Sequence, residues 1–92
     1  MREFEWDDAN VDHIAAHDVE PEEAEEALDD PMRVALSAYN TPSERRRAIA
    51  GSTLDGRLLY VVYTPRRGRL RVVTARDASE AERRSYRRRS RR

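Results

Sequence analysis

The segment 58–63, Leu-Leu-Tyr-Val-Val-Tyr, limits the fold of this chain more than any other. It is apolar or aromatic at every position, so a strand formed here has two faces that must both be covered. Turn signals bound it on either side: Asp55-Gly56, typical of a type I′ hairpin, precedes it, and Pro65-Arg66-Arg67-Gly68 follows it. We therefore expect a central strand that hairpins join to its neighbours.

Period-two patterning extends the sheet on both sides of this strand. It predicts strands over Met32–Tyr39, Arg46–Thr53 and Arg69–Ala75, and the segment 4–6 reads as a short strand or an anchoring segment. In the last predicted strand, strict alternation places Arg71 on one face of the sheet and Val72 and Thr74 on the other.

Helical signals occupy the two ends of the chain. Asp7 or Asp8 can cap a first helix, Pro21 suits the first turn of a second, and Asp29-Asp30-Pro31 ends that second helix. Ser79-Glu80-Ala81-Glu82 is a capping box that opens a C-terminal helix. The expected apolar positions are Val11, Ile14 and Ala15 in the first helix and Ala24, Ala27 and Leu28 in the second.

These elements predict an α+β fold with two N-terminal helices, a three- to four-stranded antiparallel sheet and a C-terminal helix. We expect the helices to cover one face of the sheet. A chain of 92 residues suits a single domain over 1–92, with the basic tail from about residue 87 mobile.

The charge of the chain is divided between its two halves. Residues 1–44 hold 14 acids and 2 arginines, whereas residues 45–92 hold 4 acids and 16 arginines. Such asymmetry favours a polyanion or an acidic partner, although the two halves can also neutralise each other within the fold. Cysteine is absent and no apolar run approaches the length of a membrane helix, so we expect a cytoplasmic protein without disulfides, membrane contact or cofactor.

The arginines after the central strand are the first candidates for binding phosphate. Guanidinium groups bind phosphate with two parallel hydrogen bonds and stay charged when partly desolvated. Arg76 ends a strand just before a helix, where a side chain can point into a cleft; equally, it can pair with an acid of the first half. The other members of this array are Arg66, Arg67, Arg69 and Arg71.

His13 and His17 lie four residues apart and so share one face of the first helix. Two histidines are half of a zinc site, but no third ligand has a suitable spacing, so we expect no metal. An imidazole can act as a general acid or base near neutral pH. A surface position is the stronger interpretation for His13, and both interpretations stay open for His17.

Two further residues have chemical and structural interpretations. Glu44 beside Arg45-Arg46-Arg47 would stay ionised and could accept a proton from a ribose 2′-hydroxyl, or it is the solvated beginning of a strand. Tyr86 in the last helix can stack on a base or donate a proton, or it anchors that helix to the sheet. The arginines from Arg83 onward, Arg84 among them, can contact phosphates without sequence preference.

Segments along nearly the whole chain resemble the BrnT toxins of bacterial type II toxin–antitoxin pairs. The resemblance rests on Phe4-Glu5-Trp6-Asp7, His17 and Val19 before Pro21-Glu22-Glu23-Ala24, Asp55-Gly56-Arg57-Leu58-Leu59, Arg71-Val72-Val73-Thr74-Ala75-Arg76-Asp77-Ala78 and Glu82-Arg83-Arg84-Ser85-Tyr86. The family usually has Lys-His-Gly-Val where this chain has Ala16-His17-Asp18-Val19.

The resemblance implies a fold similar to RelE-type ribonucleases and an RNA substrate. It also implies a ribbon-helix-helix antitoxin of the BrnA type that wraps the toxin and carries it to operator DNA, in a homodimer or a hetero-oligomer with the antitoxin. Together with the arginine array described above, the expected site residues are Arg76, Arg71, Glu44, His17 and Tyr86 for catalysis, with Arg45, Arg66, Arg67, Arg69, Arg83 and Arg84 for binding RNA.

Two functions of different classes follow. The first is a metal-independent endoribonuclease that inhibits translation and growth. The second is a non-catalytic module of the same fold that binds an antitoxin or nucleic acid and regulates transcription, which the altered segment Ala16-His17-Asp18 favours.

Overall fold

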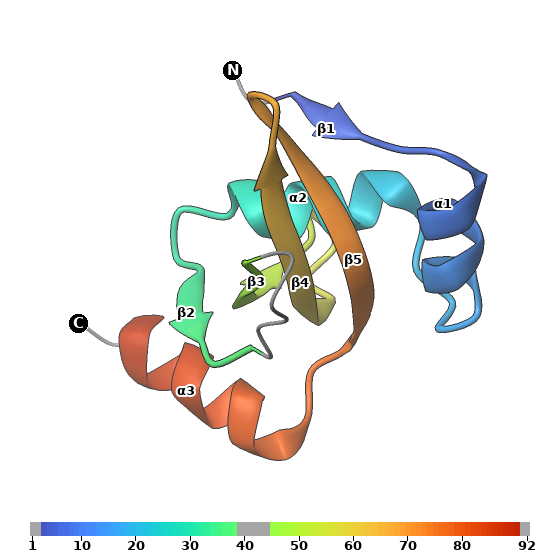
Figure 1. Ribbon diagram of the computed structural model, residues 1–92. Coiled ribbons are helices and arrows are strands. Elements are labelled where there is room, and N and C mark those ends of the chain that lie inside the picture. Colours follow the sequence, from blue (N-terminus) through green and yellow to red (C-terminus); the bar gives the residue numbers. More distant parts are fainter. Residues whose placement is uncertain (1–2, 39–44, 91–92) are drawn as a thin grey trace.

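The computed structural model describes residues 3–38 and 45–90 of the chain, without the side chain of Ser90. The strands and helices follow along the chain in the order β1, α1, α2, β2, β3, β4, β5, α3 (Figure 1). Their bounds are β1 Phe4–Glu5, α1 Asp8–Ala15, α2 Pro21–Asp29, β2 Val34–Leu36, β3 Arg47–Ser52, β4 Leu58–Arg66, β5 Arg69–Asp77 and α3 Glu80–Ser90. The α+β class is confirmed.

In the part of the chain that the structure describes, the sheet contains five strands in the order β1-β5-β4-β3-β2 and is mixed, so the prediction of three to four antiparallel strands was too small. The strands from β2 to β5 form an antiparallel meander, with β4 inside the sheet as expected. The additional strand β1 pairs in parallel with β5, Phe4 opposite Leu70. A two-residue strand carries no periodicity, and its partner lies at the other end of the chain. Local patterns therefore gave no sign of this pairing.

Local capping chemistry sets where the helices begin. Asp7 accepts a hydrogen bond from the amide of Asn10, and the Asn10 side chain accepts one from the amide of Asp7. Pro21 occupies the first turn of α2. At α3 the amide of Ser79 donates to Glu82 over 2.7 Å, and the Glu82 amide donates back to the Ser79 hydroxyl. The predicted helix starts and the predicted capping box of Ser79 and Glu82 are therefore confirmed.

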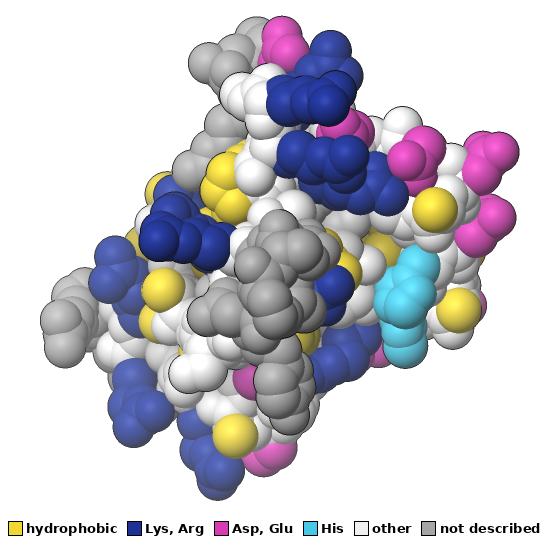
Figure 2. All heavy atoms as spheres, viewed as in Figure 1, with side chains coloured by type: hydrophobic (Ala, Val, Ile, Leu, Met, Phe, Trp, Pro, Cys, Tyr) yellow, Lys and Arg dark blue, Asp and Glu magenta, His cyan; other side chains and the backbone are white. Residues whose placement is uncertain are grey.

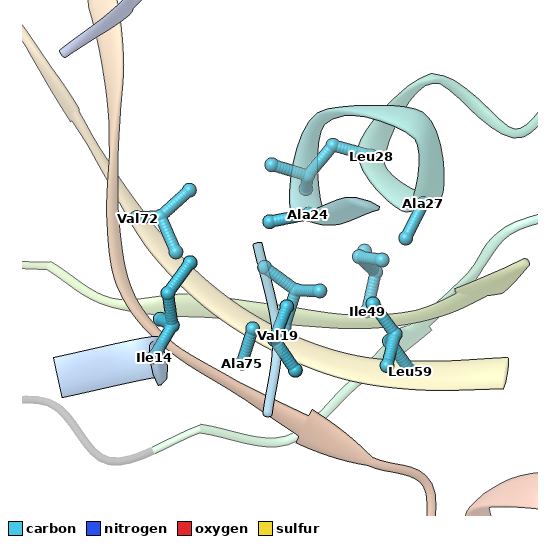
Figure 3. Close-up of a cluster of buried hydrophobic side chains, with 10 residues drawn as sticks. Ile14, Val19, Ala24, Ala27, Leu28, Ile49, Leu59, Val72 and Ala75 are labelled. Carbon is cyan, nitrogen blue, oxygen red and sulfur yellow. The ribbon is translucent and has the colours of Figure 1, made fainter. Parts of the chain in front are cut away.

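The core lies between the sheet and the helices α1 and α2 (Figure 3). Ile14 from α1 and Leu28 from α2 are fully buried. Helix α2 lies so close to β3 that a methyl group at Gly51 would collide with the carbonyl oxygen of Ala27. The cluster comprises Ile14, Val19, Ala24, Ala27, Leu28, Ile49, Leu59, Val61, Val72 and Ala75.

Helix α3 does not join the other helices on their face, which corrects the expectation of helices on one face. It contacts β2 and β3, and Figure 1 shows it beside β2, whereas α2 lies behind β4 and β5. Glu82 of α3 accepts a hydrogen bond from Arg76 of β5. Ala75, the neighbour of Arg76, belongs to the core, so the Arg76 side chain points to the opposite face of the sheet. The sheet is therefore covered by α1 and α2 on one face and partly by α3 on the other.

Of the two hairpin turns, the structure confirms the second and corrects the first. Arg67 and Gly68 both have positive φ, 53° and 78°, and form the two-residue turn between β4 and β5. At Asp55-Gly56 only Gly56 has positive φ, so the predicted type I′ turn is wrong there. Hydrogen bonds between Thr53 and Arg57 close a longer loop in its place.

Within residues 3–38 and 45–90, no helix is long and apolar enough to cross a membrane.

Candidate functional site

A bulge in β5 decides which arginines share a face of the sheet. Val62 of β4 pairs with Thr74, but the next residue, Tyr63, pairs with Val72. Val73 is therefore the extra residue of the bulge, and side-chain direction changes by one position across it. Thr74 consequently lies on the same face as Arg71, which corrects the strict alternation assumed from the sequence.

The face opposite the α1 and α2 core, called here the open face, carries a row of polar side chains along β4 and β5. The pairs across the two strands are Tyr60 with Arg76, Val62 with Thr74, Thr64 with Arg71 and Arg66 with Arg69. Figure 2 shows dark-blue arginine side chains and the cyan histidines on one face of the molecule. The bulge thus brings the arginines of the predicted array to one surface.

Arg71 is held firmly by the N-terminal segment. Its guanidinium donates to Glu5 over 3.0 Å and to both carboxylate oxygens of Asp7 over 2.9 and 3.2 Å. The hydrogen bonds with Asp7 raise the pKa of Arg71, and the same bonds lower the pKa of Asp7. Arg71 is therefore a preorganised cation whose charge is largely balanced by two carboxylates.

Arg76 lies between an aromatic ring and a carboxylate. Its guanidinium carbon is 4.3 Å from the centre of the Tyr60 ring, a cation–π contact. It also makes a two-pronged bond with Glu82, over 2.9 and 3.0 Å, and this bond raises the pKa of Arg76. Burial works to raise the pKa of Glu82, but the hydrogen bonds from Arg76 and Ser79 lower it on balance. The side chain of Arg76 is thus fixed in position and stays half-exposed.

The alternative that Arg76 pairs with an acid of the first half is wrong, because Glu82 belongs to the second half. Arg57, which was not among the candidate arginines, also pairs with the acidic half. Its guanidinium donates to Asp77 over 2.8 Å, to Glu23 over 3.2 Å and to the carbonyl oxygen of Asp18 over 2.7 Å. The bond with Asp77 raises the pKa of Arg57 and lowers that of Asp77.

The arginines of the β4–β5 hairpin are more exposed than Arg71. Arg66 and Arg69 make long ion pairs, 3.5 Å to Glu5 and 3.4 Å to Glu3, with about half of each arginine side chain exposed. Arg67 is exposed at the tip of the turn. These three extend the positive row of the open face beyond Arg71, and their exposed ion pairs contribute little to stability.

The two histidines stand at the border of the open face, His13 on α1 and His17 in the turn that follows this helix. His13 Nε2 is 3.1 Å from the hydroxyl of Thr74, and both histidines are exposed. The two rings meet edge to face with their centres 5.7 Å apart. The sequence predicts a surface position for His13 and gives no sign of its contact with Thr74. That contact depends on the bulge, which is set by the pairing of β4 with β5.

The side chain of Tyr86 contacts the end of α2 and not the arginine row. Its hydroxyl donates to Asp30 over 2.6 Å, at the end of α2. Burial and this bond raise the pKa of Tyr86 to about 12. Burial also works to raise the pKa of Asp30, but bonds from Tyr86 and from the amides of Ser52 and Met32 lower it on balance. Tyr86 borders an open cavity of about 650 Å³ whose other lining residues include Glu22, Glu25, Glu26, Asp29 and Asp30.

The remaining candidates are distributed over different parts of the structure. Glu44 lies outside the described residues. Arg45, just before β3, and Arg84 on α3 are exposed, and Arg83 donates to the carbonyl oxygen of Ala78. Among residues 3–38 and 45–90 no group of three or more His, Asp or Glu side chains has the geometry to hold a metal ion.

The arrangement of fixed and exposed arginines beside imidazoles is suited to a phosphodiester backbone, and the family comparison agrees with it. Residues 6–82 match the model of the ribonuclease toxin BrnT of type II toxin–antitoxin systems. The chain belongs to the BrnT family. The matched segment includes α1, the whole sheet after β1 and the beginning of α3. A comparison with curated proteins finds no significant match.

BrnT membership identifies the chain as a ribonuclease toxin by family and implies an RNA substrate and an antitoxin partner. The match ends at Glu82, so the arginine-rich residues 83–92 lie beyond it. For the polyanion expected from the charge distribution, the family implies RNA.

Proposed function

We propose that the chain is a metal-independent endoribonuclease that inhibits translation and growth by cutting RNA on the open face. The ribose 2′-hydroxyl attacks the neighbouring phosphorus, the bond to the 5′-oxygen breaks, and the products are a cyclic phosphate and a free 5′-hydroxyl. The observation that carries the proposal is the alignment of Arg71, Thr74 and Arg76 on one face by the bulge at Val73.

Arg76 is the residue suited to stabilising the phosphorane. Charge builds on the non-bridging oxygens in the transition state, and preorganised donors stabilise such charge strongly. Tyr60 and Glu82 fix the guanidinium from two sides, so little reorganisation is needed when phosphate arrives. The sequence also makes Arg71 or Arg45 a candidate for this role, but Arg71 lies too far from Arg76 to act on the same phosphate. A strand rises about 3.3 Å per residue, so Arg71 lies roughly 15 Å from Arg76 along β5 and serves a different phosphate of the same RNA strand.

Proton transfer needs a base at the 2′-hydroxyl and an acid at the leaving 5′-oxygen. Glu44 or His17 takes the role of base. The acid is Tyr86, or whichever of Glu44 and His17 is not the base. Tyr86 suits the acid role less, because its hydroxyl already donates to Asp30 and its raised pKa of about 12 opposes proton release.

The test is cleavage of a short RNA in EDTA by the purified protein and by two matched variants. Arg76→Ala should lower cleavage by two orders of magnitude or more, which is the order expected when one donor to a developing oxyanion is removed. Arg47→Ala is the control: Arg47 is exposed on β3, and its cross-strand partner Tyr63 packs against the core cluster. Equal cleavage by the three proteins would exclude the role given to Arg76.

The second function, a non-catalytic binding module of the same fold, has support of its own. Arg71 and Arg76 are both neutralised by carboxylates, which weakens their attraction for phosphate. Inducing the chain in a bacterial host separates the two functions. A ribonuclease arrests growth and the Arg76→Ala variant does not, whereas a pure binder leaves growth unaffected in both cases.

A further inference from the structure

His13 has a contact that a merely solvated histidine does not need. Its Nε2 atom lies 3.1 Å from Oγ1 of Thr74, sixty-one residues away in sequence. Thr74 belongs to the open face because of the bulge, on the same stretch of β5 as Arg71 and Arg76. The contact therefore orients the imidazole ring at the border of the arginine row.

A hydrogen bond at one ring nitrogen decides what the other nitrogen can do. In the neutral tautomer with hydrogen on Nε2, Nε2–H donates to Thr74 and Nδ1 keeps a free lone pair. Such a ring is a base oriented by a neighbouring side chain, as in catalytic triads. The ring of His17 meets that of His13 edge to face at 5.7 Å, so a second imidazole lies within the same small region.

We propose that His13, in place of Glu44 or His17, is the general base of the ribonuclease reaction and that His17 is its general acid; this inference rests on the proposed function. Nδ1 of His13 accepts the proton of the 2′-hydroxyl as the 2′-oxygen bonds to phosphorus. The bond from phosphorus to the 5′-oxygen breaks, and that oxygen takes a proton from the imidazolium of His17. His13 takes up one proton from the 2′-hydroxyl and His17 gives up one to the 5′-oxygen, so charge and atoms balance.

Substrates with different leaving groups separate the two roles. In a 5′-bridging phosphorothiolate RNA the leaving atom is sulfur, which departs without protonation. His17→Asn should lose activity on ordinary RNA and regain it on the sulfur substrate. His13→Asn should lose about 10²- to 10⁴-fold on both substrates, because a base is needed in either case.

Thr74 is a positioning residue, and its variants report on orientation. Thr74→Val keeps the branched side chain for the strand and removes the hydroxyl, so it should lower kcat while leaving KM nearly unchanged. Thr74→Ser retains the hydroxyl and should restore kcat. Asp12→Asn is the control, since Asp12 is an exposed titratable residue on the same helix beside His13.

Circular dichroism first establishes that each variant is folded, which is expected because both histidines are exposed. Cleavage by His13→Asn within tenfold of the unchanged protein would overturn the inference, as would its recovery on the sulfur substrate. If the unchanged protein cleaves neither substrate, the proposed ribonuclease function itself fails. If the unchanged protein cleaves RNA and His13→Asn cleaves it equally well, only the inference about His13 is rejected.

Discussion

Arg71 and Arg76 lie on the same face of β5 although they are five positions apart in the sequence. In a regular strand, side chains five positions apart point to opposite faces. The extra residue Val73 removes this difference, so the two guanidiniums reach the surface that Tyr60 and Thr64 also share. Bulges commonly re-aim side chains near functional sites, and this one creates the surface on which RNA is proposed to lie.

The salt dependence of RNA binding should report this common face. For single strands the slope of log K against log salt changes by about 0.7 for each phosphate that the protein no longer neutralises. We expect Arg71→Gln and Arg76→Gln each to reduce the slope by about that amount, and Arg47→Gln, which removes the same charge, to leave it unchanged. Fluorescence anisotropy over a salt series measures the slopes, and equal slopes for all three variants would contradict a common binding face.

Arg57 should contribute to stability rather than to catalysis. It joins Asp77, Glu23 and the carbonyl oxygen of Asp18, and so connects the end of β5 to the α1–α2 turn. Hydrogen bonds to charged groups contribute about 1.5–3 kcal/mol each, and these are partly exposed, so Arg57→Met should lower the free energy of unfolding by about 2 kcal/mol. Urea unfolding measures this change; an unchanged midpoint would show that the cluster is incidental.

Gly51 should not tolerate a side chain, although its φ is not in the left-handed region. A methyl group there collides with the backbone of Ala27 in α2, and a backbone carbonyl cannot rotate away. Overpacking typically costs about 1–3 kcal/mol, so we expect Gly51→Ala to lower the free energy of unfolding by about 3 kcal/mol. Gly68→Ala offers a comparison in which strain comes from φ alone, because open space surrounds Gly68. A smaller decrease at Gly51 than at Gly68 would argue against the close α2–β3 contact.

Acid should destabilise the fold through its paired carboxylates. The pKa values of Asp30, Asp77 and Glu82 are lowered in the folded chain, from ordinary values of 3.8 for Asp and 4.5 for Glu. Their contribution to stability is therefore complete above the unfolded values and is lost as pH falls through the lower folded values. Urea midpoints should be flat from pH 7 to about 5 and then fall below about pH 4. A midpoint that rises on acidification would contradict the ion pairs.

The hydroxyl of Tyr86 should lose its proton at a higher pH than an ordinary tyrosine. Its pKa is raised to about 12 from 10.0, so its bond to Asp30 stabilises the fold below pH 10 and is lost as pH rises through about 12. The phenolate absorbance of the unchanged protein minus that of Tyr86→Phe isolates this residue from the other tyrosines. A difference curve centred at the ordinary tyrosine value would show that the hydroxyl is not held by Asp30.

Local rules were enough for the helix starts, for the central strand and for the family. Asp7, Pro21 and the pair Ser79 and Glu82 begin the helices where the sequence indicates, because capping is an interaction between residues three apart. The apolar segment 58–63 lies inside the sheet, because its composition permits no exposed face. Motifs in sequence order also led to the BrnT family, which the match over residues 6–82 confirms.

Only the tertiary structure decided what those elements bring together. The bulge at Val73, the parallel pairing of β1 with β5 and the contact of His13 with Thr74 all depend on residues distant in sequence. The same is true of the charges: Arg76 and Arg57 look alike in the sequence, yet one faces Tyr60 and the other joins three segments of the fold. A guanidinium has the same local chemistry at every position, and its role is set by the carboxylates and rings that folding places within hydrogen-bonding distance of it.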